Sequence, residues 1–374
     1  MSDPMIANSP QQPRPSASSV QAAPSVGVLV FFFLVAAVLI GGFEYVLQAR
    51  SASLLLSLVY FTMLTQGCLA VVAAAETALG RWIRPFKGAL LAVAPMLFLL
   101  PVLFVFMYYK WPMYPKSAAP NFWHDREFFI LRNVGVLLIT ALVGNGFSAA
   151  SRAGRPSAST WAIFYLLAWV ISMSFVAFDW VMPLEWPWVS TLFGAYFFVE
   201  SFFMGLCMAA IVLYALSRRL PPGEWEAIRW PRQAAAFMLF GFSVVWGHEF
   251  FSQYLVIWYG NLPEYNSFFV YRLEVFGQWI YVVPLLLFAL PFVLLLPAAV
   301  KWNAGHVMTA ALIVLAGLVV ERVMILRPVA PLFSTTAGTG MALFEFSLLG
   351  SLVGWMISRR LPPPHDHLSA PAAV

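Results

Sequence analysis

The chain has 374 residues, of which 61% are hydrophobic and 10% are charged, and its formal net charge is +5. A soluble domain carries about 25% charged residues, so this composition excludes a water-soluble protein and predicts a polytopic membrane protein. The basic residues lie in short loops beside apolar stretches, a pattern that indicates membrane topology rather than binding to nucleic acid.

The apolar stretches begin after a polar N-terminal segment. Residues 1–25 are rich in Pro, Ser, Gln and Ala, and we expect them to form a disordered tail. Ten stretches follow, each long enough to cross about 30 Å of hydrocarbon. They cover approximately residues 26–47, 53–78, 88–109, 129–150, 160–181, 190–217, 233–258, 275–300, 306–326 and 340–358. The sequence therefore predicts an all-α integral membrane protein with about ten transmembrane helices over residues 26–358, and a C-terminal tail over 359–374.

The distribution of charge sets the expected orientation. An even number of spans places both termini on one side of the membrane, and more of the Lys and Arg residues fall in the segments on that side. Because basic residues concentrate in cytoplasmic loops, we expect both termini to be cytoplasmic. The segments on the opposite side are rich in aromatic residues and proline, which suits docking against another subunit.

Cysteine and histidine are too few to bind a redox centre. Cys68 and Cys207 both lie in apolar stretches, which excludes a disulfide framework, a thiolate zinc site and an iron–sulfur cluster. Only His248 lies deep in a span, so the chain cannot supply haem ligands on facing helices. We predict no metal site, and any haem or cluster belongs to a partner subunit.

Ionisable residues within the spans are the candidates for function, because they are costly in hydrocarbon. Glu200 lies well inside the sixth span, and the seventh contains His248 and Glu249. Trp246, Glu249 and Gln253 share one helical face, with His248 on an adjoining stripe. We expect this face to line the bundle interior or a wet cavity, where Glu200, His248 and Glu249 form a proton pathway or a site for a quinone headgroup. A structural Glu–His pair that holds helices together is the alternative.

Other charged residues lie nearer the ends of spans. Asp179, Glu185, Gln253 and Glu264 are expected to shape the outer mouth of the pathway or a quinone pocket. The remaining acidic residues at span ends are interpreted as interfacial charges or as members of local pairs such as Glu321 with Arg322; they are Glu44, Glu76, Glu274, Glu321 and Glu345.

Two long motifs resemble a known family. Residues 178–185 read FDWVMPLE and are followed at 188–198 by WVSTLFGAYFF, while residues 251–264 read FSQYLVIWYGNLPE. Both motifs resemble the second quinone-binding-type membrane subunit of alternative complex III, the bacterial quinol:cytochrome c oxidoreductase. That subunit belongs to the polysulfide-reductase membrane-subunit (NrfD-like) superfamily, and the resemblance covers about residues 26–358.

The resemblance implies a fold of two four-helix bundles with flanking helices, the first at about 53–181 and the second at about 190–326. It also implies the bacterial cytoplasmic membrane and a heteromeric complex with a multihaem cytochrome c, an iron–sulfur subunit, a sister NrfD-like subunit and small membrane subunits. In that family the sister subunit is associated with quinol oxidation, and the subunit resembled here with a proton pathway.

The sequence and the resemblance together predict a subunit that conducts protons and can bind a quinone such as menaquinone, with no redox centre of its own and no separate catalytic activity. Two alternatives stay open. One is a purely structural scaffold of the same complex. The other is a secondary transporter, which would show broken helices at matching positions in its two halves.

Overall fold

The computed structural model describes residues 24–46, 52–114, 122–326 and 336–363. All regular secondary structure in these residues is helical, and ten helical segments are long and apolar enough to cross a membrane, so the predicted all-α membrane fold is confirmed. Nearly all of the expected N-terminal tail and most of the C-terminal tail lie outside the described residues.

The bounds of the spanning helices follow the apolar stretches closely. They are α1 (Val26–Val46), α2 (Ser53–Thr77), α3 with α4 (Arg84–Leu90 and Met96–Phe104), α6 (Arg126–Arg152), α7 (Ala158–Phe175), α8 (Phe193–Ser217), α10 (Arg229–Gly260), α11 to α13 (Pro263–Phe276, Val282–Pro284 and Leu290–Leu295), α14 (Ala304–Leu326) and α15 (Thr336–Ser358). The short helices α5 (Met107–Lys110) and α9 (Pro222–Ala227) lie between spans.

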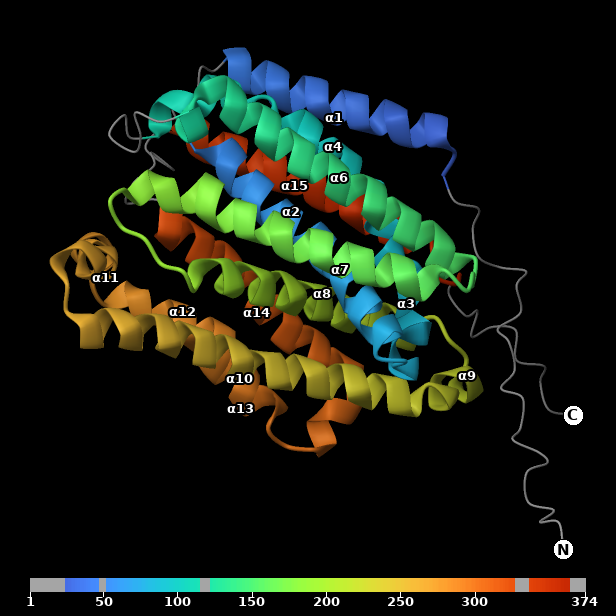
Figure 1. Ribbon diagram of the computed structural model, residues 1–374. Coiled ribbons are helices and arrows are strands. Elements are labelled where there is room, and N and C mark those ends of the chain that lie inside the picture. Colours follow the sequence, from blue (N-terminus) through green and yellow to red (C-terminus); the bar gives the residue numbers. More distant parts are fainter. Residues whose placement is uncertain (1–23, 47–51, 115–121, 327–335, 364–374) are drawn as a thin grey trace, which may run out of the picture.

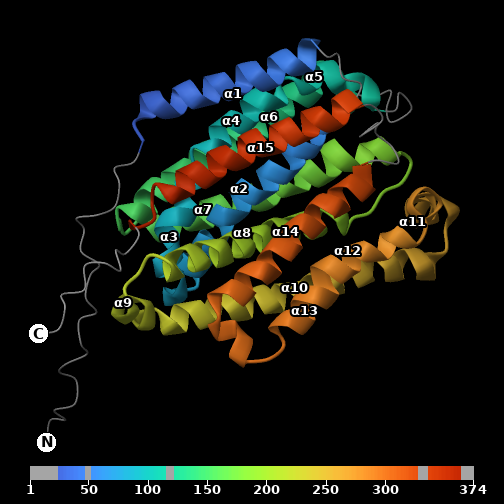
Figure 2. The same cartoon turned by 180° about the vertical axis from the view of Figure 1, so that it is seen from behind.

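Eight of the spans form two closed groups of four. Helices α2, α4, α6 and α7 pack in sequence around one ring, and α8, α10, α13 and α14 pack around a second (Figure 1). Outside the first ring, α15 packs on α2, and α1 packs on α4 and α15, as the reverse view also shows (Figure 2). We refer to these groups as the first ring and the second ring.

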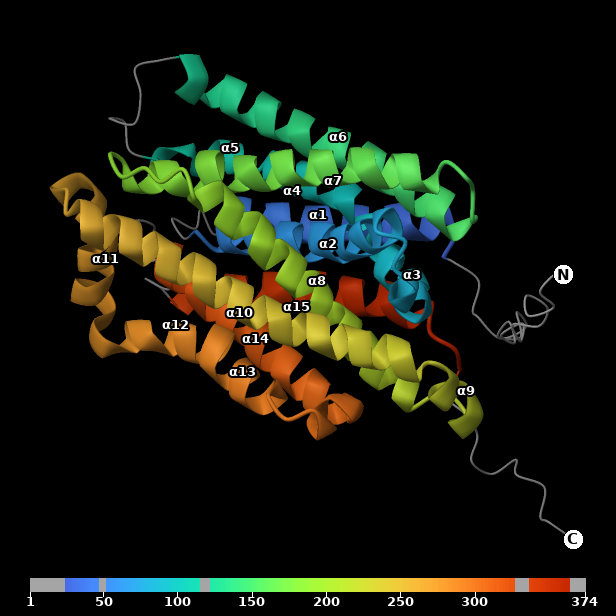
Figure 3. The ribbon, with the colours of Figure 1, turned by 60° about the horizontal axis from the view of Figure 1, so that its bottom comes forward.

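The rings meet where α2 crosses α8, and α8 runs obliquely between α7 and α10 (Figure 3). Two glycines make this crossing very close. A Cβ atom on Gly67 would lie 1.8 Å from the carbonyl oxygen of Ser201, and one on Gly205 would lie 2.2 Å from the carbonyl oxygen of Gly67. Small residues let transmembrane helices approach in this way, and dispersion forces then hold them together.

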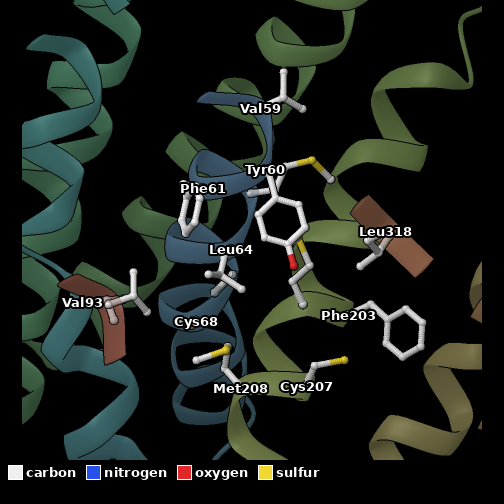
Figure 4. Close-up of a cluster of buried hydrophobic side chains, with 14 of the residues drawn as sticks. Val59, Tyr60, Phe61, Leu64, Cys68, Val93, Phe203, Cys207, Met208 and Leu318 are labelled. Carbon is white, nitrogen blue, oxygen red and sulfur yellow. The ribbon is translucent and has the colours of Figure 1, made fainter. Parts of the chain in front are cut away.

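Side chains on either side of the glycines fill the rest of the contact. Tyr60, Leu64 and Cys68 of α2 lie beside Phe203 and Cys207 of α8 (Figure 4). The Ser201 hydroxyl donates a hydrogen bond to the carbonyl oxygen of Met63 at 2.8 Å and accepts one from the Trp169 indole at 3.0 Å. The crossing therefore has a fixed register as well as a short separation.

Several spans are interrupted. The fifth span continues from α7 through a π-helical turn, η6 (Val176–Val181), and a 3₁₀ turn, η7 (Met182–Glu185). The eighth contains a second π-helical turn, η9 (Leu285–Ala289), directly after Pro284. Proline cannot donate the helical hydrogen bond, so local rearrangement at this position is expected.

The ends of the molecule are distinguishable. The start of α1 and the end of α15 lie at the same end as α9, as an even number of spans requires, whereas α5 and α11 lie at the opposite end (Figures 1 and 2). We call these the α9 end and the α11 end.

The crossing makes a testable prediction. Gly67→Ala places a methyl group against backbone of α8 that cannot rotate away, so we expect a loss of about 1–3 kcal/mol in the free energy of unfolding. Gly241→Ala in α10 is the matched control, because a Cβ atom there meets nothing within 4 Å. Unfolding of the purified chain in detergent, followed by tryptophan fluorescence, compares the two. Equal stability of both variants would contradict the close crossing.

Candidate functional site

Glu200 is the centre of the most enclosed polar group in the second ring. It lies on α8, and its side chain is fully buried. Arg322 of α14 donates to its Oε2 at 2.5 Å, and the Trp246 indole of α10 donates to its Oε1 at 3.1 Å. Three helices distant in sequence therefore converge on one carboxyl group.

A second carboxyl group shares the same arginine. Nη2 of Arg322 also donates to Oε2 of Glu321 at 3.0 Å, and the Tyr196 hydroxyl donates to Oε1 of Glu321. The Arg322 guanidinium lies over the Phe197 ring, with its Cζ atom 4.4 Å from the ring centroid. We call Tyr196, Glu200, Trp246, Glu321 and Arg322 the Glu200 cluster.

The Glu200 cluster has more acid than base. Glu200 and Glu321 face a single guanidinium, and their carboxyl groups also lie within hydrogen-bonding reach of each other. Two carboxyl groups can hydrogen bond only when one of them carries a proton. An uncompensated charge is costly in such an interior, so the arrangement favours one proton held between the two acids.

A pocket adjoins the Glu200 cluster toward the α11 end. It is a small, partly open hollow, and Tyr196 and Glu321 form part of its wall. Gln253 and Arg272 supply the other polar side chains of the wall. The rest is apolar or aromatic: Phe193, Phe250, Phe268, Phe269, Ile280, Val283, Met324 and Ile325.

The polar side chains of the pocket are tied to the loop that joins the two rings. Arg272 donates to both carboxylate oxygens of Glu185, at 3.0 and 2.8 Å, and to the carbonyl oxygens of Phe268 and Ile325. Gln253 and Ser190 hydrogen bond at 3.0 and 2.9 Å. Glu185 ends the fifth span, so the first ring fixes one wall of a pocket that belongs to the second.

The structure separates the residues singled out in the sequence. Glu200, Glu185 and Gln253 lie in the Glu200 cluster or at the pocket. Asp179 lies in the first ring, where Arg132, at 2.6 Å, and Asn133, at 3.1 Å, surround its Oδ2. Glu264 is exposed in the first turn of α11.

The expected interior position of His248 is wrong. Its side chain is exposed on the outer face of α10, whereas Trp246 is fully buried. Two residues along a helix correspond to a rotation of about 200°, so a buried Trp246 turns His248 outward. Glu249, three residues on, is half-buried, and its Oε2 has no hydrogen-bond partner among the described residues.

Glu321, Arg322 and Tyr196 were the residues that sequence reasoning missed. Glu321 and Arg322 were interpreted as a local pair at a span end, but both are buried in α14 and reach α8. Tyr196 and Glu200 lie four residues apart on α8, which places them on one face of that helix. That spacing was the available signal.

The polar contacts inside the first ring differ chemically from those inside the second ring. The central polar contacts of the first ring are neutral: Gln66 donates to the Ser172 hydroxyl at 3.0 Å, and the Tyr165 hydroxyl donates to the Gln66 carbonyl oxygen at 2.8 Å. The second ring instead holds two buried acids, Glu200 and Glu321, in one enclosed cluster. Within the described ranges, no group of three or more His, Cys, Asp or Glu side chains is placed to hold a metal ion.

No protein-family model matches this chain, and no curated protein matches it.

The Asp179 pair gives a prediction about stability. Asp179→Asn leaves the buried Arg132 without a carboxylate partner, so we expect a cost of about 3–5 kcal/mol in the free energy of unfolding. Glu127→Gln is the control, because Glu127 pairs with Arg126 at 3.5 Å on an exposed surface, and such pairs contribute at most about 1 kcal/mol. Unfolding of the two purified variants by titration with a denaturing detergent measures the difference in their free energies of unfolding. A cost for Asp179→Asn no larger than the control would show that the pair is not effectively buried.

Proposed function

We propose that this chain is a multi-pass subunit of a bacterial quinol:electron-acceptor oxidoreductase in the cytoplasmic membrane, with both termini cytoplasmic. In this proposal the second ring receives protons from a quinone-type substrate and passes them to Glu200. One observation carries the proposal: Glu321 lies in the pocket wall and, at the same time, in the buried Glu200 cluster. A group bound in the pocket would therefore have a proton acceptor that leads into the protein.

The accessible surface of the pocket is apolar, which suits the flat ring of a quinone. Five of the twelve lining residues are aromatic, and such side chains pack well against a flat ring. Nε of Arg272 is buried behind this wall and has no hydrogen-bond partner among the described residues. The amide of Gln253 is hydrogen bonded to Ser190. Oxidation of a bound quinol releases protons together with electrons, so the site needs an acceptor for the protons.

The residues of the Glu200 cluster have distinct roles in this proposal. Glu321 accepts a proton from the pocket, and the Tyr196 hydroxyl orients the Glu321 carboxylate by donating to it. Arg322 stabilises whichever carboxyl group is ionised, because its Nη2 contacts both. The proton can then move to Glu200, where the Trp246 indole stabilises the anion before protonation.

Electron transfer belongs to partner subunits in this proposal, as the resemblance implies. The partners expected from the resemblance are a multihaem cytochrome c, an iron–sulfur subunit and a sister NrfD-like subunit.

A transporter is the less favoured function. The π-helical turns lie in the fifth and eighth spans, which occupy the fourth position of the first ring and the third position of the second. These positions do not match, whereas a repeated transport site would place its helix breaks at matching positions.

Glu321→Gln tests the proposed acceptor. Glutamine preserves the shape of the side chain but cannot take up a proton, so we expect quinol-dependent reduction of the acceptor and proton release to fall about 100-fold or more in the assembled complex. Glu224→Gln, an exposed substitution in α9, is the control and should leave both rates unchanged. Rates are measured on complex purified from native membranes.

Assembly of the complex is measured in parallel with the rates, because a lower rate has a different meaning when the complex does not assemble. Co-purification of a multihaem cytochrome c and an iron–sulfur protein with the tagged chain supports the complex, and a colourless chain that purifies alone contradicts it. Loss of assembly in Glu321→Gln, but not in Glu224→Gln, would indicate a scaffold. Normal assembly with unchanged turnover and proton release would remove the relay.

A further inference from the structure

A second enclosed group of ionisable side chains lies outside both the pocket and the second ring. It is formed where α1, α2, α5 and α15 meet, toward the α11 end. Its members are Glu44 of α1, Ser53 and Ser57 of α2, Lys110 of α5 and Glu345 of α15. We call these residues the Glu345 cluster.

Each member of the Glu345 cluster contacts at least one other member. Lys110 forms an ion pair with Oε2 of Glu44, and the Ser53 hydroxyl donates to Oε1 of Glu44 at 2.9 Å. The Ser57 hydroxyl donates to Oε2 of Glu345 at 2.6 Å. Glu345 is 0% exposed, and Glu44 and Lys110 are 6% and 8% exposed.

The two carboxyl oxygens of Glu345 differ in their hydrogen bonding. Its Oε1 is buried and receives no hydrogen bond from any donor in the part of the chain that the structure describes. The carboxyl groups of Glu345 and Glu44 also lie within hydrogen-bonding reach of each other. An ionised Glu345 would therefore have one unsatisfied oxygen and a neighbouring negative charge, whereas a protonated Glu345 could donate toward Glu44.

The charges in the Glu345 cluster also favour a protonated carboxyl group. Among the described residues, two carboxyl groups of the Glu345 cluster face one ammonium group, so one negative charge has no described counterpart. The Arg132–Asp179 and Arg272–Glu185 pairs, by contrast, balance one acid with one base. A buried charge without compensation is costly, and a carboxyl group in that position takes up a proton.

We propose that the Glu345 cluster is a second proton-binding site, in which Glu345 carries a proton on Oε1 and shares it with Glu44. This proposal does not depend on the proposed function of the second ring. A proton fits better than a sodium ion, because both serine hydroxyls already donate to the carboxylates and Lys110 already neutralises Glu44. A sodium ion would need several oxygen atoms free to converge on it.

Infrared spectroscopy of the purified full-length protein tests the proposal, because the C=O stretch of a carboxylic acid is separate from the bands of a carboxylate. We expect Glu345→Gln to remove the carboxylic-acid intensity of one group per chain, with unchanged thermal stability. We expect Lys110→Met to add the intensity of one group, since Glu44 then loses its counter-charge and takes up a proton. The double variant should return to the wild-type intensity.

Two further variants serve as controls for the infrared measurement. Glu200→Gln alters the other buried acid cluster, so its difference spectrum identifies the bands that do not belong to Glu345. Ser57→Ala removes one hydrogen bond to Glu345 and should shift the Glu345 band without removing it; this variant decides the question if Glu345→Gln does not fold.

Three results would overturn the proposal. Carboxylic-acid intensity that is unchanged in Glu345→Gln would mean that Glu345 is ionised. An unshifted band in Ser57→Ala would mean that no protonated carboxyl group contacts Ser57. A band that appears in choline buffer but disappears on addition of sodium would identify a sodium site instead of a proton site.

Discussion

The backbone contact between α2 and α8 is the constraint on which the rest of the structure depends. Gly67 and Gly205 leave no space for side chains between the two helices, so neither helix can rotate about its axis without a backbone clash. Ser201 then faces the first ring and contacts Met63 and Trp169. Its neighbour Glu200 must face the second ring, where α10 and α14 supply its partners. The direction of one acidic side chain thus follows from small residues that carry no chemistry themselves.

Charge balance distinguishes two kinds of buried acidic group. Arg132–Asp179 and Arg272–Glu185 each pair one base with one acid, and both pairs connect segments that are distant in sequence. Such pairs fix geometry, because removal of either partner leaves a costly charge. The Glu200 and Glu345 clusters each combine two acids with one base. A proton would balance the second acid in each cluster, and both of our proposals place a proton there.

The number of spans could be predicted from sequence because hydrocarbon requires each segment to satisfy its own backbone hydrogen bonds. The site could be predicted only in part. Glu200 was found because it lies far from either end of its span. Glu321 and Glu345 were assigned to the interface because depth along one span does not reveal which helices pack beside it. His248 was placed inside for its residue type, although the burial of Trp246 turns it outward. These errors concern helix rotation and packing, which one span considered alone does not determine.

The π-helical turn in the fifth span has a consequence for which features evolutionarily related chains should share. A π turn contains about one residue more than an α turn, and in an α-helix one residue corresponds to a rotation of about 100°. The residues after Val176–Val181, including Glu185, therefore owe their direction to what amounts to a local insertion. Because Glu185 positions Arg272 in the pocket wall, the insertion and the arginine are useful only together. Chains that share this ancestry should keep both or have lost both, so their joint presence would mark the lineages that retained the pocket.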